Sequence, residues 1–344
     1  NRCVEMLKKY NVEILDAIQE DFGNRDYKAG FISEIMSTIS SINHAKENVK
    51  KWMKDEKRKS NPSQPFAIRT VMSLFGAKSW IKYQPLGTVG VISPWNFPIN
   101  LVLSPLGTIF AAGNRVMIKP SEFTPVTSDL TEKMFKEFFD PSEAAVFTGG
   151  PDVAAAFSAL PFDHLLFTGS TQTGKLVMKS ASENLVPVTL ELGGKSPVIV
   201  DENADLKNTA TKVMRGKTMN AGQICLAPDY VMVPKGKSED FVKESENAVK
   251  SMYENLKYNQ SYTSVINEKH YDRLNSLIED AKEKGADIRV INPADEDFSQ
   301  QEVHKIPPTL VLNPTDDMDI MKEEIFGPLL PIKEYDDFQE TIGY

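Results

Sequence analysis

The sequence predicts an α/β protein of two domains, each built on a largely parallel sheet with helices on both faces. Between residues 88 and 191, short apolar segments rich in β-branched residues alternate with longer helical segments. Such alternation is typical of parallel strands joined by crossover helices. The same pattern starts again after Ser196, and 344 residues suffice for about two domains.

The composition limits the class of protein and its partners. A hydrophobic content of 41% and a charged content of 25% are typical of globular proteins. A net charge of −9 argues against a general binder of nucleic acid or of anionic membranes. Cys3 and Cys225 lie far apart in dissimilar contexts, which favours a reducing compartment such as the cytoplasm over a disulfide framework. The chain begins with Asn1 and shows no signal segment, so we expect it to begin inside a longer protein.

Two amphipathic helices are expected first. Residues 2–21 and 29–59 carry apolar side chains at helical spacing. The lysines in the last turns of the second helix are interpreted as cations near a helix C-terminus rather than as a binding patch. Prolines at 62 and 65 indicate a loop over residues 61–65. Residues 68–85 contain hydrophobic stretches around Gly76 that indicate a hairpin.

The alternating units follow in order. Strands are expected at residues 88–93, 115–119, 145–148, 164–168 and 188–191, with helices at 99–112, 126–139, 151–159 and 173–182. Residues 83–114 carry no charge, but their many prolines and glycines argue for a buried strand, a loop and a buried helix instead of a membrane span. The second unit has expected strands at 198–201, 229–233, 288–291, 309–312 and 330–333, and helices at 206–214, 238–256 and 268–284.

Three loops follow expected strands at their carboxyl ends, where parallel sheets bind ligands. Their sequences are Pro-Trp-Asn-Phe-Pro at 94–98, Lys-Pro-Ser-Glu at 119–122 and Phe-Thr-Gly-Ser at 167–170. The last opens a helix whose N-terminus can bind a phosphate, although it lacks the G-x-G-x-x-G spacing. Lys119 and Glu122 can recognise a ribose diol, or can simply be solvated at a strand end.

A carboxylate and a thiol flank the expected domain boundary near Gly193 and Gly194. Glu191 precedes the two glycines, and Cys225 lies in a small, turn-prone run. Together they suggest a base and a nucleophile in one covalent mechanism, in a crevice between the domains. A cysteine is more often a small buried hydrophobic residue, so the pair alone does not decide the function.

Six segments in this order together resemble the NAD(P)-dependent aldehyde dehydrogenase superfamily. They are the three loops above, Glu-Leu-Gly-Gly-Lys at 191–195, Gly-Gln-Ile-Cys at 222–225 and Glu-Ile-Phe-Gly-Pro at 324–328. The resemblance covers nearly the whole chain. Residues 21–25 and 225–230 are most similar to the branch that contains coniferyl-aldehyde and class 3 aldehyde dehydrogenases. The family continues past the position of Tyr344, so we expect a C-terminal part to be missing.

The resemblance implies a fold and a mechanism. It implies a Rossmann-like NAD-binding domain at residues 1–66 and 86–193, an oligomerisation hairpin at 67–85 and an incomplete catalytic domain at 194–344. Cys225 would attack the aldehyde to form a thiohemiacetal, with the Asn96 amide and the Cys225 backbone N–H donating to the oxyanion. Hydride loss would leave a thioester, and Glu191 would activate the water that hydrolyses it.

The resemblance also implies the cofactor contacts. Lys119 and Glu122 match positions that bind the adenosine ribose, and Ser170, beside Gly169, matches a pyrophosphate contact. Glu324 matches the residue that holds the nicotinamide ribose, with Phe326 nearby. Trp95 and Leu192, in the same motifs, complete the expected set. Glu122 would repel a 2′-phosphate, which favours NAD over NADP. As alternatives, Asn96 can be a helix cap and Phe326 a turn residue.

Substrates, partners and rival functions follow from the same resemblance. We expect an aromatic, coniferyl-type aldehyde or a medium or long aliphatic aldehyde as substrate, and a homodimer or homotetramer. The rivals are a coenzyme A-acylating aldehyde dehydrogenase, a cysteine hydrolase and an inert structural relative. Glu191 favours hydrolysis of the thioester, and no motif contains the histidine that a cysteine hydrolase needs. No metal is predicted, because the four histidines are scattered (His44, His164, His270 and His304).

Overall fold

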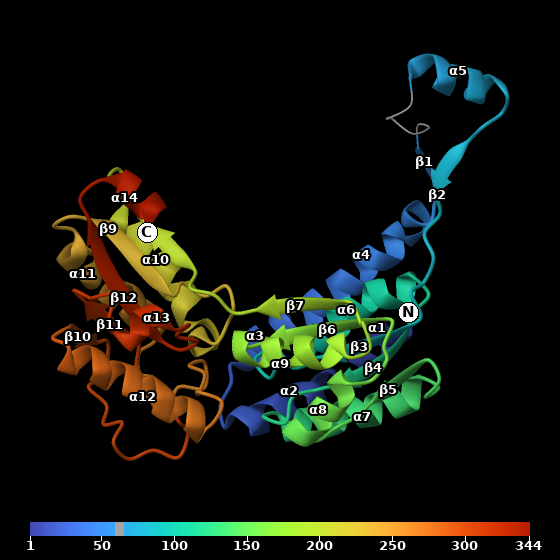
Figure 1. Cartoon of the computed structure of the whole chain (residues 1–344). Coiled ribbons are helices and arrows are strands. Elements are labelled where there is room, and N and C mark those ends of the chain that lie inside the picture. Colours follow the sequence, from blue (N-terminus) through green and yellow to red (C-terminus); the bar gives the residue numbers. More distant parts are fainter. Residues whose placement is uncertain (59–64) are drawn as a thin grey trace.

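The computed structural model describes residues 1–58 and 65–344, and Figure 1 shows how their helices and strands are arranged. This part of the chain contains two five-stranded sheets and one two-stranded ribbon. The ribbon and a short helix form an arm that projects away from both sheets (Figure 1). The α/β class with parallel sheets, predicted from the alternation of elements, is confirmed.

The N-terminal region is helical, but not as two uninterrupted helices. Its elements are α1 (Arg2–Lys9), α2 (Asn11–Phe22), α3 (Tyr27–Gly30), a π-helix (Phe31–Met36) and α4 (Ser37–Trp52). The prediction of one helix over residues 2–21 was wrong at Tyr10. There the Asn11 side chain donates to the carbonyl of Lys8 over 2.6 Å, which satisfies a C-terminal carbonyl of α1 and ends that helix.

The arm differs from the expected hairpin. The helix expected to reach residue 59 ends at Trp52, because the backbone of β1 (Glu56–Arg58) pairs antiparallel with β2 (Ser79–Ile81). Most of the first half of the expected hairpin is instead α5 (Phe66–Leu74), and Gly76 follows it with a φ of 83°. Residues 61–64 of the expected proline loop lie outside the described residues.

The first sheet has the predicted parallel strands, with bounds shifted by a few residues. It contains β3 (Thr88–Ile92), β4 (Arg115–Lys119), β5 (Ala144–Val146), β6 (His164–Gly169) and β7 (Val188–Leu192), in the order β5-β4-β3-β6-β7. Its helices are α6 (Asn100–Ala111), α7 (Pro125–Phe138), α8 (Pro151–Ser158) and α9 (Thr171–Ser182). The core with α6, α7 and the N-terminal helices covers one face, and the core with α8 and α9 covers the other.

The uncharged run 83–114 therefore forms β3 and α6, as predicted. Its strand is buried from Val89 to Ile92, which explains its continuous apolar sequence. In the described part of the chain, none of the helices has both the length and the apolar character that crossing a membrane requires.

The second sheet has the order β10-β11-β12-β9-β8. Its strands are β8 (Pro197–Ile199), β9 (Tyr230–Pro234), β10 (Asp287–Val290), β11 (Thr309–Leu312) and β12 (Leu329–Tyr335). Only β10 runs antiparallel to its neighbour. Helices α10 (Leu206–Thr218) and α11 (Ser238–Met252) pack on one face, and α12 (Glu268–Glu283) with α13 (Asp319–Lys322) on the other. Helix α14 (Phe338–Gly343) follows β12.

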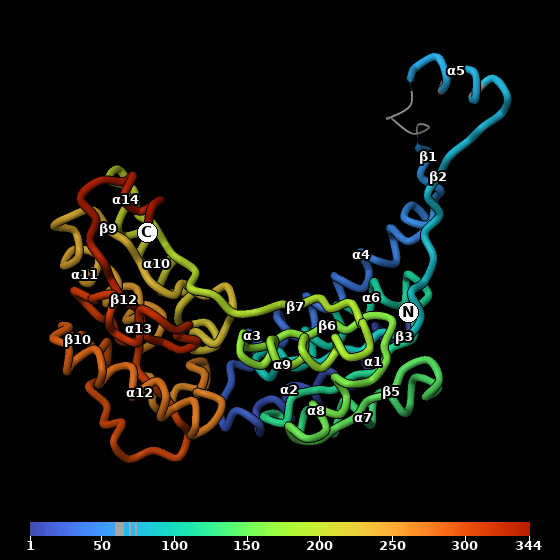
Figure 2. Tube along the Cα trace, viewed as in Figure 1, coloured from blue at the N-terminus to red at the C-terminus, as the bar shows by residue number. Residues whose placement is uncertain are grey.

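The register of the first sheet places the three predicted loops in one row. Ile92 is paired with both Lys119 and Phe167, and Thr168 is paired with Glu191, so these strands end at the same edge. The N-terminal segment reaches the part of the chain that carries the second sheet near this edge (Figure 2). Asn24 donates its side-chain amide to the carbonyl of Tyr262 over 2.6 Å and accepts the backbone N–H of Ser264 at 2.9 Å.

Candidate active site

The loop that carries Cys225 has an unusual backbone. Asn220, Ala221 and Gly222 have φ angles of 50°, 51° and 72°, so three consecutive residues occupy the left-handed region. Asn and Gly tolerate this region, but Ala adopts it at a cost. A β-carbon on Gly222 would lie 2.3 Å from the carbonyl oxygen of Gly327, so only glycine allows the two segments to approach. The side chain of Cys225 is exposed at the end of this loop.

Gln223 anchors the same loop in the interior. Its buried side-chain amide donates to the carbonyls of Asn220 at 2.9 Å and Ser264 at 3.0 Å, and its Oε1 accepts the backbone N–H of Ile266 at 3.0 Å. A buried side chain whose donor and acceptor groups are both engaged in this way is fixed in position. Gln223 therefore anchors the cysteine loop to the interior. It lies in the Gly-Gln-Ile-Cys motif, but no role was predicted for it from the sequence.

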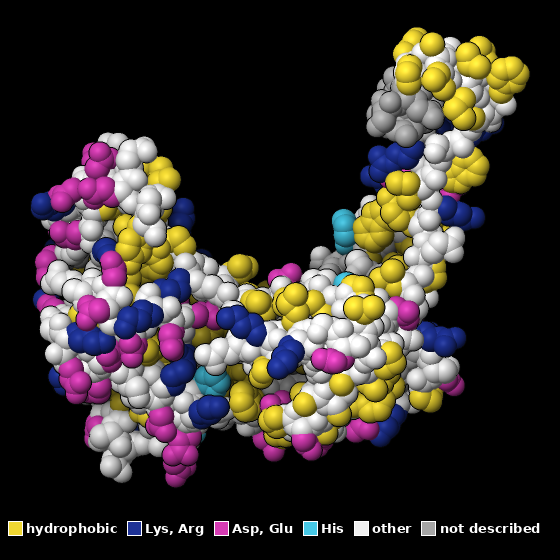
Figure 3. All heavy atoms as spheres, viewed as in Figure 1, with side chains coloured by type: hydrophobic (Ala, Val, Ile, Leu, Met, Phe, Trp, Pro, Cys, Tyr) yellow, Lys and Arg dark blue, Asp and Glu magenta, His cyan; other side chains and the backbone are white. Residues whose placement is uncertain are grey.

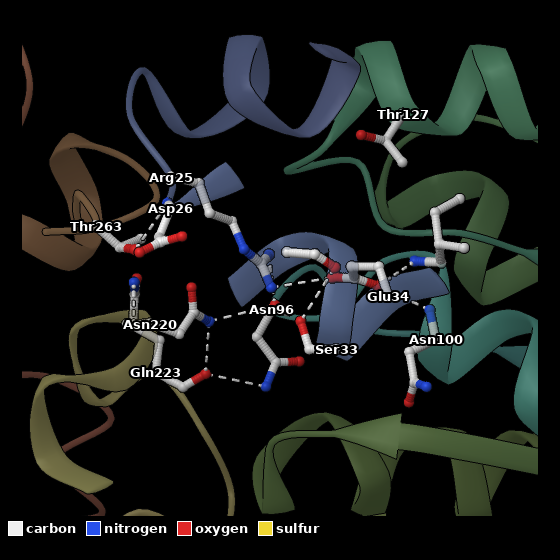
Figure 4. Close-up of polar contacts among 12 residues, drawn as sticks. Arg25, Asp26, Ser33, Glu34, Asn96, Asn100, Thr127, Asn220, Gln223 and Thr263 are labelled. Carbon is white, nitrogen blue, oxygen red and sulfur yellow. Dashed lines mark hydrogen bonds and ion pairs between the residues drawn. The ribbon is translucent and has the colours of Figure 1, made fainter. Parts of the chain in front are cut away.

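Asn96 contacts the cysteine loop directly. Its side-chain Nδ2 donates to the backbone carbonyl of Gln223 over 3.1 Å, and its own backbone carbonyl accepts Nδ2 of Asn220 at 3.3 Å (Figure 4). An amide nitrogen carries two hydrogens, so one remains for a ligand. The alternative that Asn96 caps the following helix is not supported, because Ile99 occupies the N-cap position of α6 and the first backbone N–H groups of the helix donate to the carboxylate of Glu34.

Two carboxylates influence the thiol. The surrounding protein partly desolvates the sulfur and so raises the pKa of the Cys225 thiol, and the negative charges of Glu324 and Glu191 raise it further. Hydrogen bonding from the backbone N–H groups of Cys225 and Leu226 opposes the shift. The three predicted groups are thus close enough to interact, although they come from three separate segments. Without a ligand, the surroundings of the sulfur favour the neutral thiol.

Glu324 lies against the glycine pair that follows β7. A β-carbon on Gly193 would be 1.8 Å from Oε2 of Glu324, and the backbone of Gly194 forms a hydrogen bond with the carboxylate. Burial raises the pKa of Glu324, and the charge of Asp229 adds to the rise, while Gly194, Arg273 and Lys195 oppose it.

A charged network that the sequence did not predict holds the segment around Glu324. Lys195 forms an ion pair with Asp229 and donates to the carbonyls of Ile320 and Glu323 at 2.9 Å. Asp229 also accepts the backbone N–H of Ile325 at 2.9 Å. Both residues lie in segments that carry the family resemblance, but only their proximity in the fold reveals the pairing.

Two further cations border this network. Arg273 donates to the carbonyl of Glu324 at 3.3 Å and to that of Ile325. Lys217 is fully buried, and burial lowers its pKa to about 8, opposed by the charges of Asp229 and Glu324. Nothing in the sequence indicated that Lys217, a lysine within α10, is buried beside the site.

Aromatic residues from the connections of both sheets meet beside the site. The rings of Trp95 and Phe326 are 5.4 Å apart at 83°, and the ring of His270 lies 5.1 Å from Trp95. Phe326 has a φ of 48°, so the segment turns sharply there. Two expected cofactor residues are therefore in contact, and they present an apolar surface suitable for a planar ring.

The remaining expected cofactor residues lie along the edge of the first sheet. Lys119 is 1% exposed and pairs with Glu122 at 2.8 Å. Ser170 caps α9 by accepting the backbone N–H of Thr173 at 3.2 Å, so the N-terminus of a 12-residue helix faces this edge. No hydrogen bond between described residues joins these groups to Cys225. Gly169 and Leu192 pack inward, against Phe167 and Gly174 respectively.

This set of residues fits a dinucleotide. A helix N-terminus can bind pyrophosphate, a Lys–Glu pair can bind a ribose, and the Trp95–Phe326 surface can cover a flat ring. Unpartnered polar atoms gather near the same place. Within residues 1–58 and 65–344, five buried side-chain polar atoms lack a partner, and four belong to residues around the Asn96–Gln223 contact (Ser93, Asn220, Ser264 and His270). Such atoms are expected where a ligand or water binds.

Comparisons with known proteins agree with this geometry. A family model described as "Aldehyde dehydrogenase family" matches residues 1–344. The chain is 54% identical over 344 residues to a probable coniferyl aldehyde dehydrogenase of Caulobacter vibrioides, covering 100% of this chain and 70% of that protein. It is 33% identical over 339 residues to mouse aldehyde dehydrogenase family 3 member B3, covering 98% of this chain and 66% of that protein.

Solved structures are similar over almost the whole chain. A substrate-bound state of Staphylococcus aureus AldH superposes with a TM-score of 0.89 and 38% identity, covering 99% of this chain and 71% of that one. The NAD⁺ complex of an aldehyde dehydrogenase from Bacillus cereus has a TM-score of 0.85 and 27% identity, covering 99% of this chain and 67% of that one.

Proposed function

The chain belongs to the aldehyde dehydrogenase family, as its motifs predicted, and from this premise we propose that it oxidises a coniferyl-type aromatic aldehyde to the carboxylic acid, with NAD⁺ as the hydride acceptor. The similarity to a probable coniferyl aldehyde dehydrogenase supports the substrate class. The observation that carries the proposal is the hydrogen bond from Asn96 to the Gln223 carbonyl, which places an amide donor beside the loop of a thiol nucleophile.

The chain's own residues supply the covalent steps. The thiolate of Cys225 attacks the planar carbonyl carbon and forms a carbon–sulfur bond. The second amide hydrogen of Asn96 and the backbone N–H of Cys225 donate to the oxyanion that develops. The tetrahedral carbon that bears this oxyanion can release a hydride as the carbon–oxygen double bond re-forms, which the planar aldehyde cannot. Bound NAD⁺ supplies the hydride acceptor.

The second half of the reaction releases the acid. Loss of hydride leaves a thioester on Cys225. Glu191, exposed at the end of β7, takes a proton from water as the water oxygen attacks the acyl carbon. The carbon–sulfur bond then breaks and the sulfur leaves. Aldehyde, water and NAD⁺ thus give carboxylic acid, NADH and a proton. A base in this position favours hydrolysis over transfer to coenzyme A.

The residues along the sheet edge hold the cofactor in this proposal. Lys119 and Glu122 bind the adenosine ribose, and the N-terminus of α9 with Ser170 binds the pyrophosphate. Glu324, whose carboxylate lies against Gly193 and Gly194, would hold the nicotinamide ribose. The carboxylate of Glu122 repels a 2′-phosphate, which is why we propose NAD rather than NADP.

Steady-state kinetics and intact-protein mass spectrometry test the nucleophile and the base. We expect NADH formation from coniferyl aldehyde, abolished in Cys225→Ser and unchanged in the control Cys3→Ser. Glu191→Gln should form NADH in a single turnover and accumulate an acyl-enzyme that mass spectrometry detects. Wild-type turnover by Cys225→Ser would show that another group is the nucleophile, and product appearing only with coenzyme A would favour the acylating reaction.

We further propose that the arm joins subunits of a homo-oligomer in the cytoplasm. Apolar side chains gather around α5 in Figure 3, and the exposed ones in this arm include Leu74 at 81% and Phe75 at 88% exposure. Burial of such a patch against a second subunit is favourable. Both cysteines are free, which suits a reducing compartment. Light scattering should report a dimer or tetramer that Phe75→Glu dissociates, while Val12→Glu on α2 should have no effect.

A further inference from the structure

A buried ion pair lies behind Asn96, outside the residues assigned to the reaction. Nη2 of Arg25 is 3.0 Å from Oε1 of Glu34, and their side chains are 5% and 0% exposed (Figure 4). Arg25 follows α2 and Glu34 lies in the π-helix, so the pair belongs to the N-terminal helices rather than to either sheet. π-Helical turns are rare and are often found at functional sites.

Glu34 fixes the start of α6. Its second oxygen, Oε2, accepts the backbone N–H groups of Ile99 at 3.1 Å and Asn100 at 2.8 Å. These are the N-cap residue and the first residue of the helix that follows Asn96. The carboxylate therefore satisfies two donors that a helix N-terminus leaves free, and it holds one end of the Asn96 loop.

Arg25 contacts Asn96 itself. Nη1 donates to the backbone carbonyl of Asn96 over 2.8 Å, while the guanidinium lies 4.7 Å from the ring centre of Phe22 and 5.0 Å from that of Phe97. The planar group thus lies close to two aromatic rings and is oriented by Glu34. Glu34 and the Asn96 carbonyl accept hydrogen bonds from its two terminal nitrogens.

Stability alone does not account for this pair. Burial lowers the pKa of Arg25 and raises that of Glu34, and their mutual attraction opposes both shifts. A buried ion pair is often no more stabilising than apolar residues of the same volume. A pair that instead orients a neighbouring group has a role that apolar residues cannot fill.

We propose that Arg25 is a positioning residue for the oxyanion donor Asn96, and that Glu34 positions Arg25. Arg25 and Asn220 hold the Asn96 backbone carbonyl, and the Gln223 carbonyl holds one hydrogen of the Asn96 amide. With both ends of the residue fixed, the second amide hydrogen keeps one direction, toward the oxyanion formed at Cys225. This inference rests on the proposed function.

A double-mutant cycle separates positioning from general stabilisation. The first measurement is kcat/KM for oxidation of the aldehyde by wild type, Arg25→Met, Asn96→Ala and the double variant. The second is the rate at which the same four proteins hydrolyse a p-nitrophenyl ester without NAD⁺. Arg25→Met should lower both rates by about 10- to 100-fold, with the KM for NAD⁺ unchanged, because misplacing a catalytic group by about 1 Å has an effect of this size. In the Asn96→Ala background the same substitution should change the rates by less than about threefold.

The N-terminal helices provide a matched control. Asp21 also accepts two backbone N–H groups at the start of a helix, those of Val126 at 3.0 Å and Thr127 at 2.9 Å in α7, but it does not contact Asn96. Glu34→Gln and Asp21→Asn both replace a helix-capping carboxylate by an amide. Both should lower the melting temperature, but only Glu34→Gln should lower the rate of ester hydrolysis.

Arg25→Lys keeps the experiment decisive if Arg25→Met does not fold. Lysine retains the charge opposite Glu34 but lacks the planar fork, so we expect a loss of about tenfold that again disappears in the Asn96→Ala background. Equal losses in both backgrounds, or wild-type rates in folded Arg25 variants, would overturn the inference. If the wild-type enzyme formed no NADH from any aldehyde, while the variants still lost ester hydrolysis in this pattern, the proposed function would be contradicted and the positioning role would remain supported.

Discussion

The carboxylate of Glu324 occupies the space in which Gly193 would carry a side chain, since a β-carbon there would lie 1.8 Å from Oε2. The two residues are far apart in the sequence. Gly193 follows β7 of the first sheet, and Glu324 precedes β12 of the second sheet. Their contact joins the end of β7, which carries the proposed base, to the segment that carries the proposed nicotinamide-ribose ligand.

Gly193→Ala should therefore weaken NAD⁺ binding by displacing Glu324. The backbone of Gly193 does not have a positive φ, so the loss comes from the collision and not from backbone strain. We expect an increase of about tenfold or more in the calorimetric Kd for NAD⁺. Gly194→Ala is the matched control, because a β-carbon at Gly194 meets nothing within 4 Å. Equal Kd values for the two variants would contradict the assignment of Glu324.

The reactivity of Cys225 should respond to the two nearby acids. Because Glu324 and Glu191 raise the pKa of the thiol, Glu324→Gln and Glu191→Gln should each lower it and increase the thiolate fraction at pH 7.5. Alkylation by iodoacetamide without NAD⁺, followed by mass spectrometry of the Cys225 peptide, should accelerate by about two- to fivefold. Glu202→Gln, at an exposed position in the second domain, should have no effect. Slower alkylation in Glu191→Gln would mean that Glu191 deprotonates the thiol.

Cofactor preference should depend on Glu122. Glu122→Gln removes the negative charge that repels a 2′-phosphate and frees Lys119 from its ion pair at 2.8 Å. The ratio of kcat/KM for NADP⁺ over NAD⁺ should rise by about tenfold, as expected for one charge interaction near a protein surface. Glu132→Gln, which breaks an exposed ion pair with Lys136 on α7, controls for net charge. An unchanged ratio would show that Glu122 does not contact the adenosine ribose.

The stability of the fold should fall in mild acid because of His270. Burial lowers the pKa of His270 from 6.5 to about 4, and the charges of Arg273 and Lys269 add to this effect. The unfolded chain therefore takes up the proton first, so the free energy of unfolding decreases as the pH falls from 6.5 toward 4. One pKa unit corresponds to about 1.4 kcal/mol, so the change from 6.5 to about 4 sets an upper bound of about 3.5 kcal/mol on the loss of stability.

Urea unfolding at several pH values measures this dependence. His270→Gln should flatten the acid limb between pH 4 and 6.5, whereas His44→Gln, at an exposed position on α4, should leave it unchanged. An acid limb with the same slope in His270→Gln would assign the loss of stability to other groups.

Local pattern was sufficient for most of the first sheet. Continuous β-branched runs such as that of β3 are typical of buried parallel strands, and helices of moderate length between them leave few alternatives for the connections. One prediction was wrong because a distant partner decides the structure. Residues 56–58 were assigned to a helix because lysine-rich sequence is compatible with one, but their backbone groups pair with residues 79–81. The apolar residues of α5 fit a strand or a helix equally, so periodicity over so short a stretch does not distinguish them.

The sequence alone determined the α/β class, the family and the identities of the proposed nucleophile, base and oxyanion donor, because these depend on residue type and on order along the chain. Only the tertiary structure decided which groups act on one another: the Arg25–Glu34 pair behind Asn96, Gln223 beneath the cysteine loop, and Lys195 with Asp229 beside Glu324. Arginine, glutamate and lysine are common on protein surfaces, and nothing in their spacing marks them as buried. Their role arises from desolvation and from contacts between residues far apart in the chain, and both exist only once the chain has folded.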